Sequence, residues 1–172
     1  MPSKLIKIAI IGAESTGKTA LAEALAEHYN TNWVIEFSRP FLEALGRPYT
    51  AADVETIARG QMKIEDMMIA ETPDILFCDT NLLVIKIWMD NAYGATPNWI
   101  LQEIDNRRYD LHILTDWDIP YEPDPLREHP EMRDYFTAKY QEELESRNLN
   151  FIKVSGSIKD RIAQCEQAIA AL

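Results

Sequence analysis

Short runs of apolar residues alternate along the chain with longer segments in which apolar residues recur every three or four positions. The apolar runs are KIAII (7–11), WVIEF (33–37), DILFC (74–78), LHILT (111–115) and FIKV (151–154). Nearly continuous apolar strands separated by helices are typical of a parallel sheet with helices on both faces. The pattern therefore predicts an α/β fold with five parallel strands.

The helical segments between these runs have recognisable first turns. Thr50 and Asp53 have the spacing of a capping box at the start of a helix over residues 51–70. Ser157 and Asp160 have the same spacing before a last helix. A further helix is expected directly after residue 17, between the first two strands.

One segment breaks this regularity. Residues 116–130, DWDIPYEPDPLREHP, contain four prolines and several acidic residues, a composition that prevents ordinary helix or strand. We expect a mobile loop there.

Composition narrows the possible functions. A chain of 172 residues with 47% hydrophobic residues has the size of one domain, 1–172, and its net charge of -11 argues against nucleic acid as a partner. Cys78 and Cys165 are too few for a disulfide framework. The sequence shows neither a signal peptide nor an apolar stretch of about 18 residues, so we expect a cytoplasmic protein without a membrane partner.

The stretch GAESTGKT, residues 12–19, matches G-x-x-x-x-G-K-[ST] between an apolar strand and a helix. Backbone N–H groups in such a loop, together with the helix N-terminus, form a cradle for a polyphosphate. Lys18 is expected to bridge the β- and γ-phosphates of ATP, and the Thr19 hydroxyl to bind Mg²⁺. The alternative, a glycine-rich turn that binds nothing, is disfavoured by these flanks. The residues expected to contact the nucleotide are Gly12, Ala13, Glu14, Ser15, Thr16, Gly17, Lys18, Thr19 and Ala20.

Carboxylates near the ends of two other strands should face the same crevice, because ligands bind beyond the carboxyl ends of parallel strands. Asp79 follows the third apolar run, as a residue that supports Mg²⁺ does, although capping the next helix is a compatible alternative. Glu36 ends the second run and is a candidate to accept a proton from an attacking hydroxyl. A solvated glutamate is the alternative there, and the general base stays open between the two carboxylates.

Arginines near the irregular loop are candidates for stabilising the transferred phosphoryl group. Arg127 and Arg133 flank that segment and suit a lid that closes over the negative charge, although either is also an ordinary surface residue. His28, His112 and His129 are scattered without cysteine or carboxylate at metal-ligand spacing, so Mg²⁺ bound with the nucleotide is the expected metal.

Taken together, the ordered motifs resemble those of a known family. GAESTGKT, EFSRPF, IARG, FCDTN, YDLHIL, PYEPDPLR with Arg133 beyond it, and FIKV span nearly the whole chain. In this order they resemble the ribosylnicotinamide kinase domain of the bacterial NAD-biosynthesis regulator family. Longer members of that family add a DNA-binding helix-turn-helix and a nucleotidyltransferase domain. We expect this chain to be the kinase module alone.

The resemblance implies a fold, a reaction and further site residues. The fold is that of P-loop nucleoside monophosphate kinases, with strand order 2-3-1-4-5 and a lid at about residues 116–134. The reaction is transfer of the γ-phosphoryl group of Mg-ATP to the 5′-hydroxyl of nicotinamide riboside. The residues that fall in the family's substrate-side and lid motifs are Glu36, Phe37, Arg39, Thr80, Asn81, Tyr121, Asp124 and Arg127; Tyr121 is expected to stack on the nicotinamide ring.

Departures from the family pattern keep two alternatives open. Asn81 stands where the family usually has a second carboxylate, and Pro40 and Pro125 are further differences that bear on the substrate. One alternative is a kinase of another nucleoside or nucleotide. The other is a nucleotide-sensing module that presents Trp88, Tyr93 and Trp99 to a partner, although we expect these side chains to lie in the core or the substrate pocket.

Overall fold

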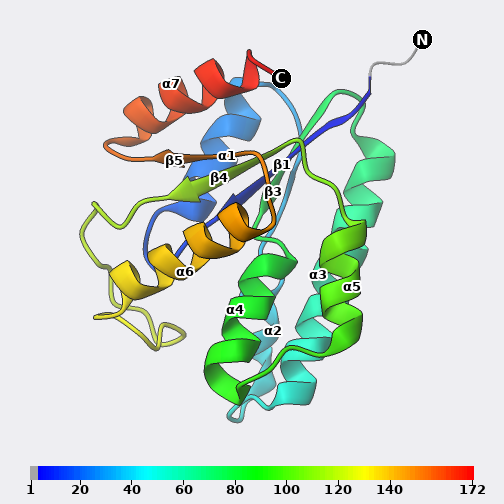
Figure 1. The fold of residues 1–172 in the computed structure, drawn as a ribbon, viewed down its shortest axis with the longest axis vertical. Helices are drawn as coiled ribbons and strands as arrows, with labels where there is room; N and C mark the ends of the chain where they lie inside the picture. The colour runs from blue at the N-terminus through cyan, green and yellow to red at the C-terminus, as the bar shows by residue number, and fades with distance from the viewer. Residues whose placement is uncertain (1–3) are drawn as a thin grey trace.

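The computed structural model describes residues 4–172, which form a five-stranded parallel sheet in the order β2-β3-β1-β4-β5 (Figure 1). The strands are β1 (Ile6–Ile11), β2 (Trp33–Val34), β3 (Ile75–Asp79), β4 (Leu111–Thr115) and β5 (Phe151–Val154). The parallel sheet and its strand order agree with the prediction. β1 is the central strand, so the loop that follows it lies in the middle of the row formed by the carboxyl ends of the strands.

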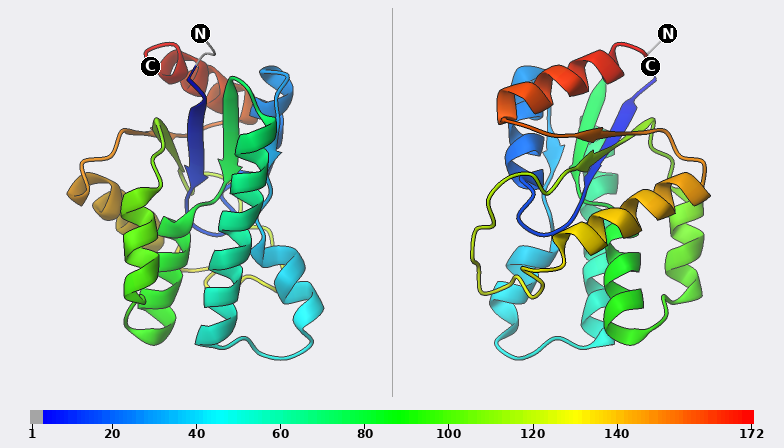
Figure 2. Two further views of the ribbon diagram at one scale, coloured as in Figure 1. Left: turned by 90° about the vertical axis from the view of Figure 1, so that its right-hand side faces the viewer. Right: turned by 60° about the vertical axis from the view of Figure 1, so that its left-hand side comes forward.

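Helices cover both faces of the sheet, as the views in Figure 2 show. They are α1 (Lys18–His28), α2 (Ser38–Leu45), α3 (Ala51–Glu71), α4 (Leu82–Tyr93), α5 (Asn98–Asn106), α6 (Arg133–Ser146) and α7 (Ile158–Ile169). Alternate residues of β1 point to opposite faces. Ile8 and Ile10 pack with α1 and α7, whereas Ala9 and Ile11 pack with α4 and α6.

Both predicted capping boxes are present. The Asp53 carboxylate accepts a hydrogen bond from the Thr50 backbone N–H at 2.7 Å, and the Asp160 carboxylate accepts one from Ser157 N–H at 3.0 Å. In both helices the N-cap hydroxyl in turn accepts from the N–H of the aspartate. The helix expected over 51–70 begins at Ala51 and ends at Glu71.

The second strand is shorter than the expected 33–37. β2 ends at Val34 because α3 binds the following backbone: the Gln61 amide accepts from Phe37 N–H at 2.8 Å and donates to the Ile35 carbonyl at 3.1 Å. These bonds replace the ladder that would continue a strand. The prediction was wrong here, and Glu36 lies in the loop between β2 and α2.

The segment between β4 and α6 contains turns and bends but neither helix nor strand, as its prolines predict. We call residues 116–132 the lid segment; Arg133, expected within it, is the first residue of α6. The lid segment contacts the loop after β1, because the Glu14 carboxylate accepts from Glu128 and His129 N–H groups at 3.0 and 3.2 Å. Within residues 4–172, no helix has the length and apolar character needed to cross a bilayer.

Candidate active site

The loop from Gly12 to Gly17 joins β1 to α1 and has the backbone conformation of an anion-binding nest. Ser15 and Gly17 have positive φ values of 53° and 81°, whereas Thr16 between them does not have a positive φ. At Gly12 a Cβ would lie 2.3 Å from Thr115 Oγ1, a distance that no side chain tolerates. Glycine at this position therefore lets the loop lie directly against the end of β4.

This loop forms one wall of a cavity of about 590 Å³. All nine residues expected to contact the nucleotide line it. The opposite walls come from the β2–α2 loop, α2, the α2–α3 loop, α4, the lid segment and α6. Their residues include Glu36, Ser38, Arg39, Tyr49, Ile87, Trp88, Asn91, Glu122, Arg127, Phe136 and Tyr140. Segments far apart in the sequence thus enclose one space at the carboxyl edge of the sheet.

Lys18 is one of the residues that line this cavity. Its ammonium donates to the Ala13 carbonyl at 2.7 Å, within the loop that precedes it. Burial lowers the pKa of Lys18, while the nearby carboxylates of Glu36, Asp79 and Glu14 act in the opposite direction. Glu36 and Asp79, the two carboxylates predicted at the site, therefore both act to raise the pKa of Lys18.

Asp79, the last residue of β3, is fully buried beside Thr19 and lies behind the residues that line the cavity. The Thr19 hydroxyl donates to Asp79 Oδ2 at 2.5 Å, and Oδ1 has no hydrogen-bond partner among the described residues. Burial, and next the charge of Glu36, raise the pKa of Asp79 to about 6. A carboxylate oxygen without a protein partner beside a threonine hydroxyl fits the oxygen-ligand preference of Mg²⁺. Residues 4–172 contain no cluster of three or more His, Cys, Asp or Glu side chains that could hold a metal ion, so a metal here would need further ligands from the nucleotide.

Part of the cavity wall is aromatic: Trp88 was expected in the core or the substrate pocket, whereas Tyr49 was not predicted at the site. Tyr49 and Trp88 meet edge to face, with ring centroids 5.0 Å apart. Trp88 Nε1 donates to the Tyr49 hydroxyl at 3.0 Å, and that hydroxyl donates to Glu128 at 2.9 Å. Burial raises the pKa of Tyr49 to about 12. A tryptophan within an apolar segment could have indicated that Trp88 lies at the site. No feature of the sequence around Tyr49 indicates the same for that residue.

The predicted arginines take different positions. Arg127 lines the cavity and donates to the Glu122 carbonyl. Arg39 also lines it and pairs with Asp124 of the lid segment at 3.0 Å, so two separately predicted residues meet. Arg133 does not line the cavity, because its guanidinium donates to the Ser15 and Ile119 carbonyls at 3.1 and 2.8 Å.

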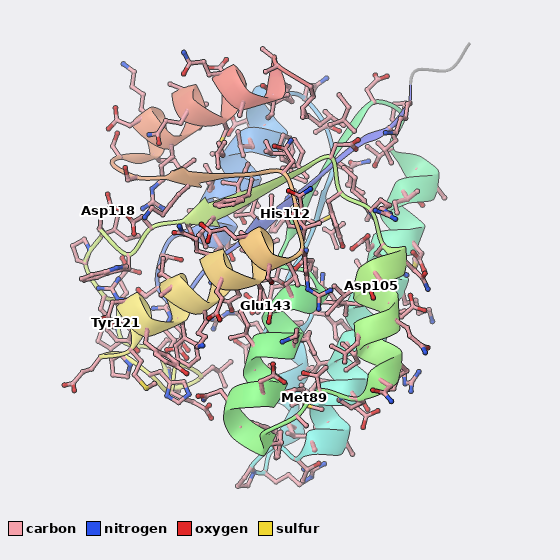
Figure 3. All side chains as sticks on the ribbon, in the orientation of Figure 1. Met89, Asp105, His112, Asp118, Tyr121 and Glu143 are labelled. Atoms are coloured by element: carbon pink, nitrogen blue, oxygen red, sulfur yellow. The ribbon has the colours of Figure 1, made fainter. Side chains whose placement is uncertain are left out.

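Several residues expected at the substrate lie outside the cavity lining. Phe37 packs against Gly60 of α3, and the Asn81 side chain accepts from Leu83 N–H at the start of α4. Thr80 is 4% exposed. Tyr121, labelled on the lid segment in Figure 3, lies 5.5 Å from the Arg133 guanidinium instead of on the cavity wall. Direct substrate contacts by these residues, and by Asp124, stay untested predictions.

Comparison with known proteins identifies the family. The AAA domain family matches residues 7–161, and the chain belongs to this family. Among curated proteins, the trifunctional NAD biosynthesis/regulator protein NadR of Escherichia coli (strain K12) is 28% identical over 169 residues, 94% of this chain. The resemblance inferred from the motifs is confirmed at that level. The chain spans 41% of the length of that relative.

Solved structures have the same fold. A NadR protein in complex with NR has a TM-score of 0.83 and 21% identity, with 96% of this chain and 51% of that chain covered. A deoxyadenosine kinase from M. mycoides has a TM-score of 0.67 and 15% identity, with 97% of this chain and all of that chain covered. Both similarities show the architecture of the sheet and its helices.

Proposed function

We propose that this member of the AAA domain family is an ATP-dependent kinase of nicotinamide riboside, which forms nicotinamide mononucleotide. The observation that carries the proposal is a single cavity that joins the phosphate-binding loop to Glu36 and the aromatic wall. A NadR relative that aligns with 94% of the chain supports the choice of acceptor. A solved NadR protein with the same fold, in complex with NR, also supports this choice.

In this proposal ATP, the phosphoryl donor, binds on the side of the cavity that the phosphate-binding loop forms. Backbone N–H groups of residues 13–19 and the Lys18 ammonium hold the β- and γ-phosphates of ATP. Thr19 and Asp79 would hold Mg²⁺, which when bound neutralises charge on the phosphates. Arg127, on the lid segment, adds positive charge that balances the negative charge spread over the equatorial oxygens of the transferred group in the transition state.

The acceptor occupies the side of Glu36. A flat pyridinium ring suits a wall made of Tyr49 and Trp88, since aromatic faces attract cations. The 5′-hydroxyl then lies between the γ-phosphate and Glu36, which lines the cavity, while Asp79 lies behind the lining beside Thr19. Glu36 is therefore the carboxylate better placed to accept the proton, and positioning of the two substrates supplies most of the rate.

A kinase of another nucleoside is the second candidate, because a deoxyadenosine kinase has the same architecture over 97% of this chain. A nucleotide acceptor would need further cations for its own phosphate. The cations that line the cavity are Lys18, Arg39 and Arg127, and Arg39 is already paired with Asp124. The cavity thus favours an acceptor without a phosphate.

A sensor that presents its aromatic residues to a partner has less support. Trp88 lines the cavity, and Trp99 is partly buried with its Nε1 donating to Glu55 at 2.7 Å. Tyr93 is 42% exposed and alone does not make an apolar surface.

The test is product formation with a panel of acceptors. Purified protein, Mg-ATP and one of nicotinamide riboside, deoxyadenosine, cytidine, uridine or nicotinamide mononucleotide are incubated, and phosphorylated products are separated by chromatography. We expect ADP and nicotinamide mononucleotide in equal amounts with the riboside, and much slower turnover with the others. Faster phosphorylation of another acceptor would replace the proposed substrate, and no product from any acceptor would count against a kinase.

A further inference from the structure

Arg161 is a buried arginine of α7 that joins three separate segments near the phosphate-binding loop. Arg161 is only 2% exposed. The guanidinium donates to the Thr16 carbonyl at 2.5 Å, to the Gly156 carbonyl at 3.1 Å and to the Asp116 carbonyl at 3.2 Å. It also forms a 2.6 Å ion pair with Asp118.

The bond to Thr16 has a consequence for the neighbouring peptide. Every peptide bond of the described chain is trans, and in a trans peptide the C=O and the following N–H point in opposite directions. Arg161 lies outside the cavity lining, whereas Thr16 and Gly17 line it. A carbonyl of Thr16 held toward Arg161 therefore directs the N–H of Gly17 toward the cavity.

A second arginine acts on the preceding peptide in the same way. Arg133 donates to the Ser15 carbonyl at 3.1 Å, which turns the N–H of Thr16 away from that guanidinium. Ser15 and Gly17 both have positive φ, at 53° and 81°, and for Ser15 this conformation is unfavourable without external support. The two arginines thus hold two consecutive peptides of the loop from outside the cavity lining.

The position of Arg161 also ties the loop to the root of the lid segment. Asp118 accepts from Arg161 through one carboxylate oxygen and from Gly156 N–H, at 2.6 Å, through the other; Figure 3 labels Asp118 at this end of the lid segment. A buried guanidinium is stable only with its charge paired and its donors satisfied, and these four partners meet that requirement. Lysine has no planar array of donors with which to bridge the same acceptors.

We propose that Arg161 is a positioning residue of the phosphate-binding loop, holding the Thr16 carbonyl so that the Gly17 N–H faces a bound polyphosphate. It acts on the ligand through the loop backbone and does not touch it. This inference rests on the polyphosphate-binding part of the proposed function and is independent of which acceptor the enzyme uses.

The test measures polyphosphate binding without an acceptor. Inorganic tripolyphosphate and the ATP analogue AMP-PNP are titrated by calorimetry into wild type, Arg161→Lys and Arg161→Met, with Lys159→Met as control. Lys159 is exposed on the same helix, so its variant matches the loss of one charge. We expect about 10- to 100-fold weaker binding of both ligands by Arg161→Lys and Arg161→Met. The control should change binding by less than about twofold.

Arg161→Lys separates positioning from charge, because it keeps the cation and loses the bridging geometry. Wild-type affinity in Arg161→Lys, or equal losses in Arg161→Met and the Lys159 control, would overturn the inference and leave the proposed function intact. Absence of tripolyphosphate and AMP-PNP binding by the wild type would instead overturn the proposed function, and the inference with it.

A measurement on the wild type covers the case in which both Arg161 variants fail to fold. In ¹⁵N-edited NMR spectra, the Gly17 amide should shift strongly on addition of tripolyphosphate, because its N–H becomes a donor to phosphate. A Gly17 amide that stays unchanged while the ligand binds would contradict the proposed orientation of this peptide.

Discussion

Replacement of Asp79 by asparagine should change how stability depends on pH. Asp79 is fully buried, and burial together with the charge of Glu36 raises its pKa from 3.8 to about 6. The folded protein therefore binds this proton more tightly than the unfolded chain does. Asp79→Asn removes the titrating group and keeps the size and shape of the side chain.

The magnitude follows from the two pKa values. A rise from 3.8 to about 6 corresponds to about 3 kcal/mol of unfavourable free energy for the ionised carboxylate in the folded state. Below pH 3.8 the carboxyl is protonated in both states and this penalty is absent. It develops as the pH rises and is complete above pH 6. Between about pH 4 and pH 8, the wild type should thus lose about 3 kcal/mol relative to Asp79→Asn.

The assay is urea unfolding followed by tryptophan fluorescence, without nucleotide or metal, at several pH values from 4 to 8. Because the remaining acids are common to both proteins, the difference between the two free energies of unfolding isolates Asp79. Any fixed cost of burying the amide N–H groups shifts that difference equally at every pH. Glu27→Gln, at an exposed site on α1, is the control and should follow the wild type. Curves for wild type and Asp79→Asn that stay parallel within about 0.5 kcal/mol would refute this account of the buried carboxylate.

Three further substitutions test the site. Lys18→Ala should lower turnover by at least about 10²- to 10³-fold, measured as ADP release, because it removes the cation at the phosphates; near-normal turnover would contradict that role. Arg127→Ala should lower kcat by about tenfold or more with a smaller change in the KM for ATP, and a change confined to KM would argue for ground-state binding alone. Gly12→Ala should lower the free energy of unfolding by about 1–3 kcal/mol and weaken AMP-PNP binding, because its Cβ would meet Thr115 Oγ1 at 2.3 Å; unchanged thermal stability would show that the loop can move aside.

Features encoded by neighbouring residues could be predicted from the sequence. The phosphate-binding loop and the capping boxes at Thr50 and Ser157 depend on residues within one or two turns of each other. The parallel sheet follows from apolar runs that are buried on both faces. Strand order came from the resemblance to a family, because periodicity alone does not determine which strands pair.

Features that depend on distant residues could not be predicted in this way. The end of β2 is set by Gln61, 26 residues beyond the Ile35 carbonyl to which it donates. The role proposed for Arg161 depends on a contact with Thr16 across 145 residues. Tyr49 joins the cavity wall only because the fold places it beside Trp88 of α4.

The central claim is that one cavity brings a triphosphate and an acceptor hydroxyl together, with the magnesium-supporting Asp79 directly behind its wall. A crystal structure with Mg²⁺, AMP-PNP and nicotinamide riboside tests it most directly. We expect the 5′-oxygen of the riboside at about 3–3.5 Å from the γ-phosphorus and within hydrogen-bond distance of Glu36 or Asp79. A riboside bound outside the cavity, or with its 5′-hydroxyl turned away from the γ-phosphate and both carboxylates, would contradict the account.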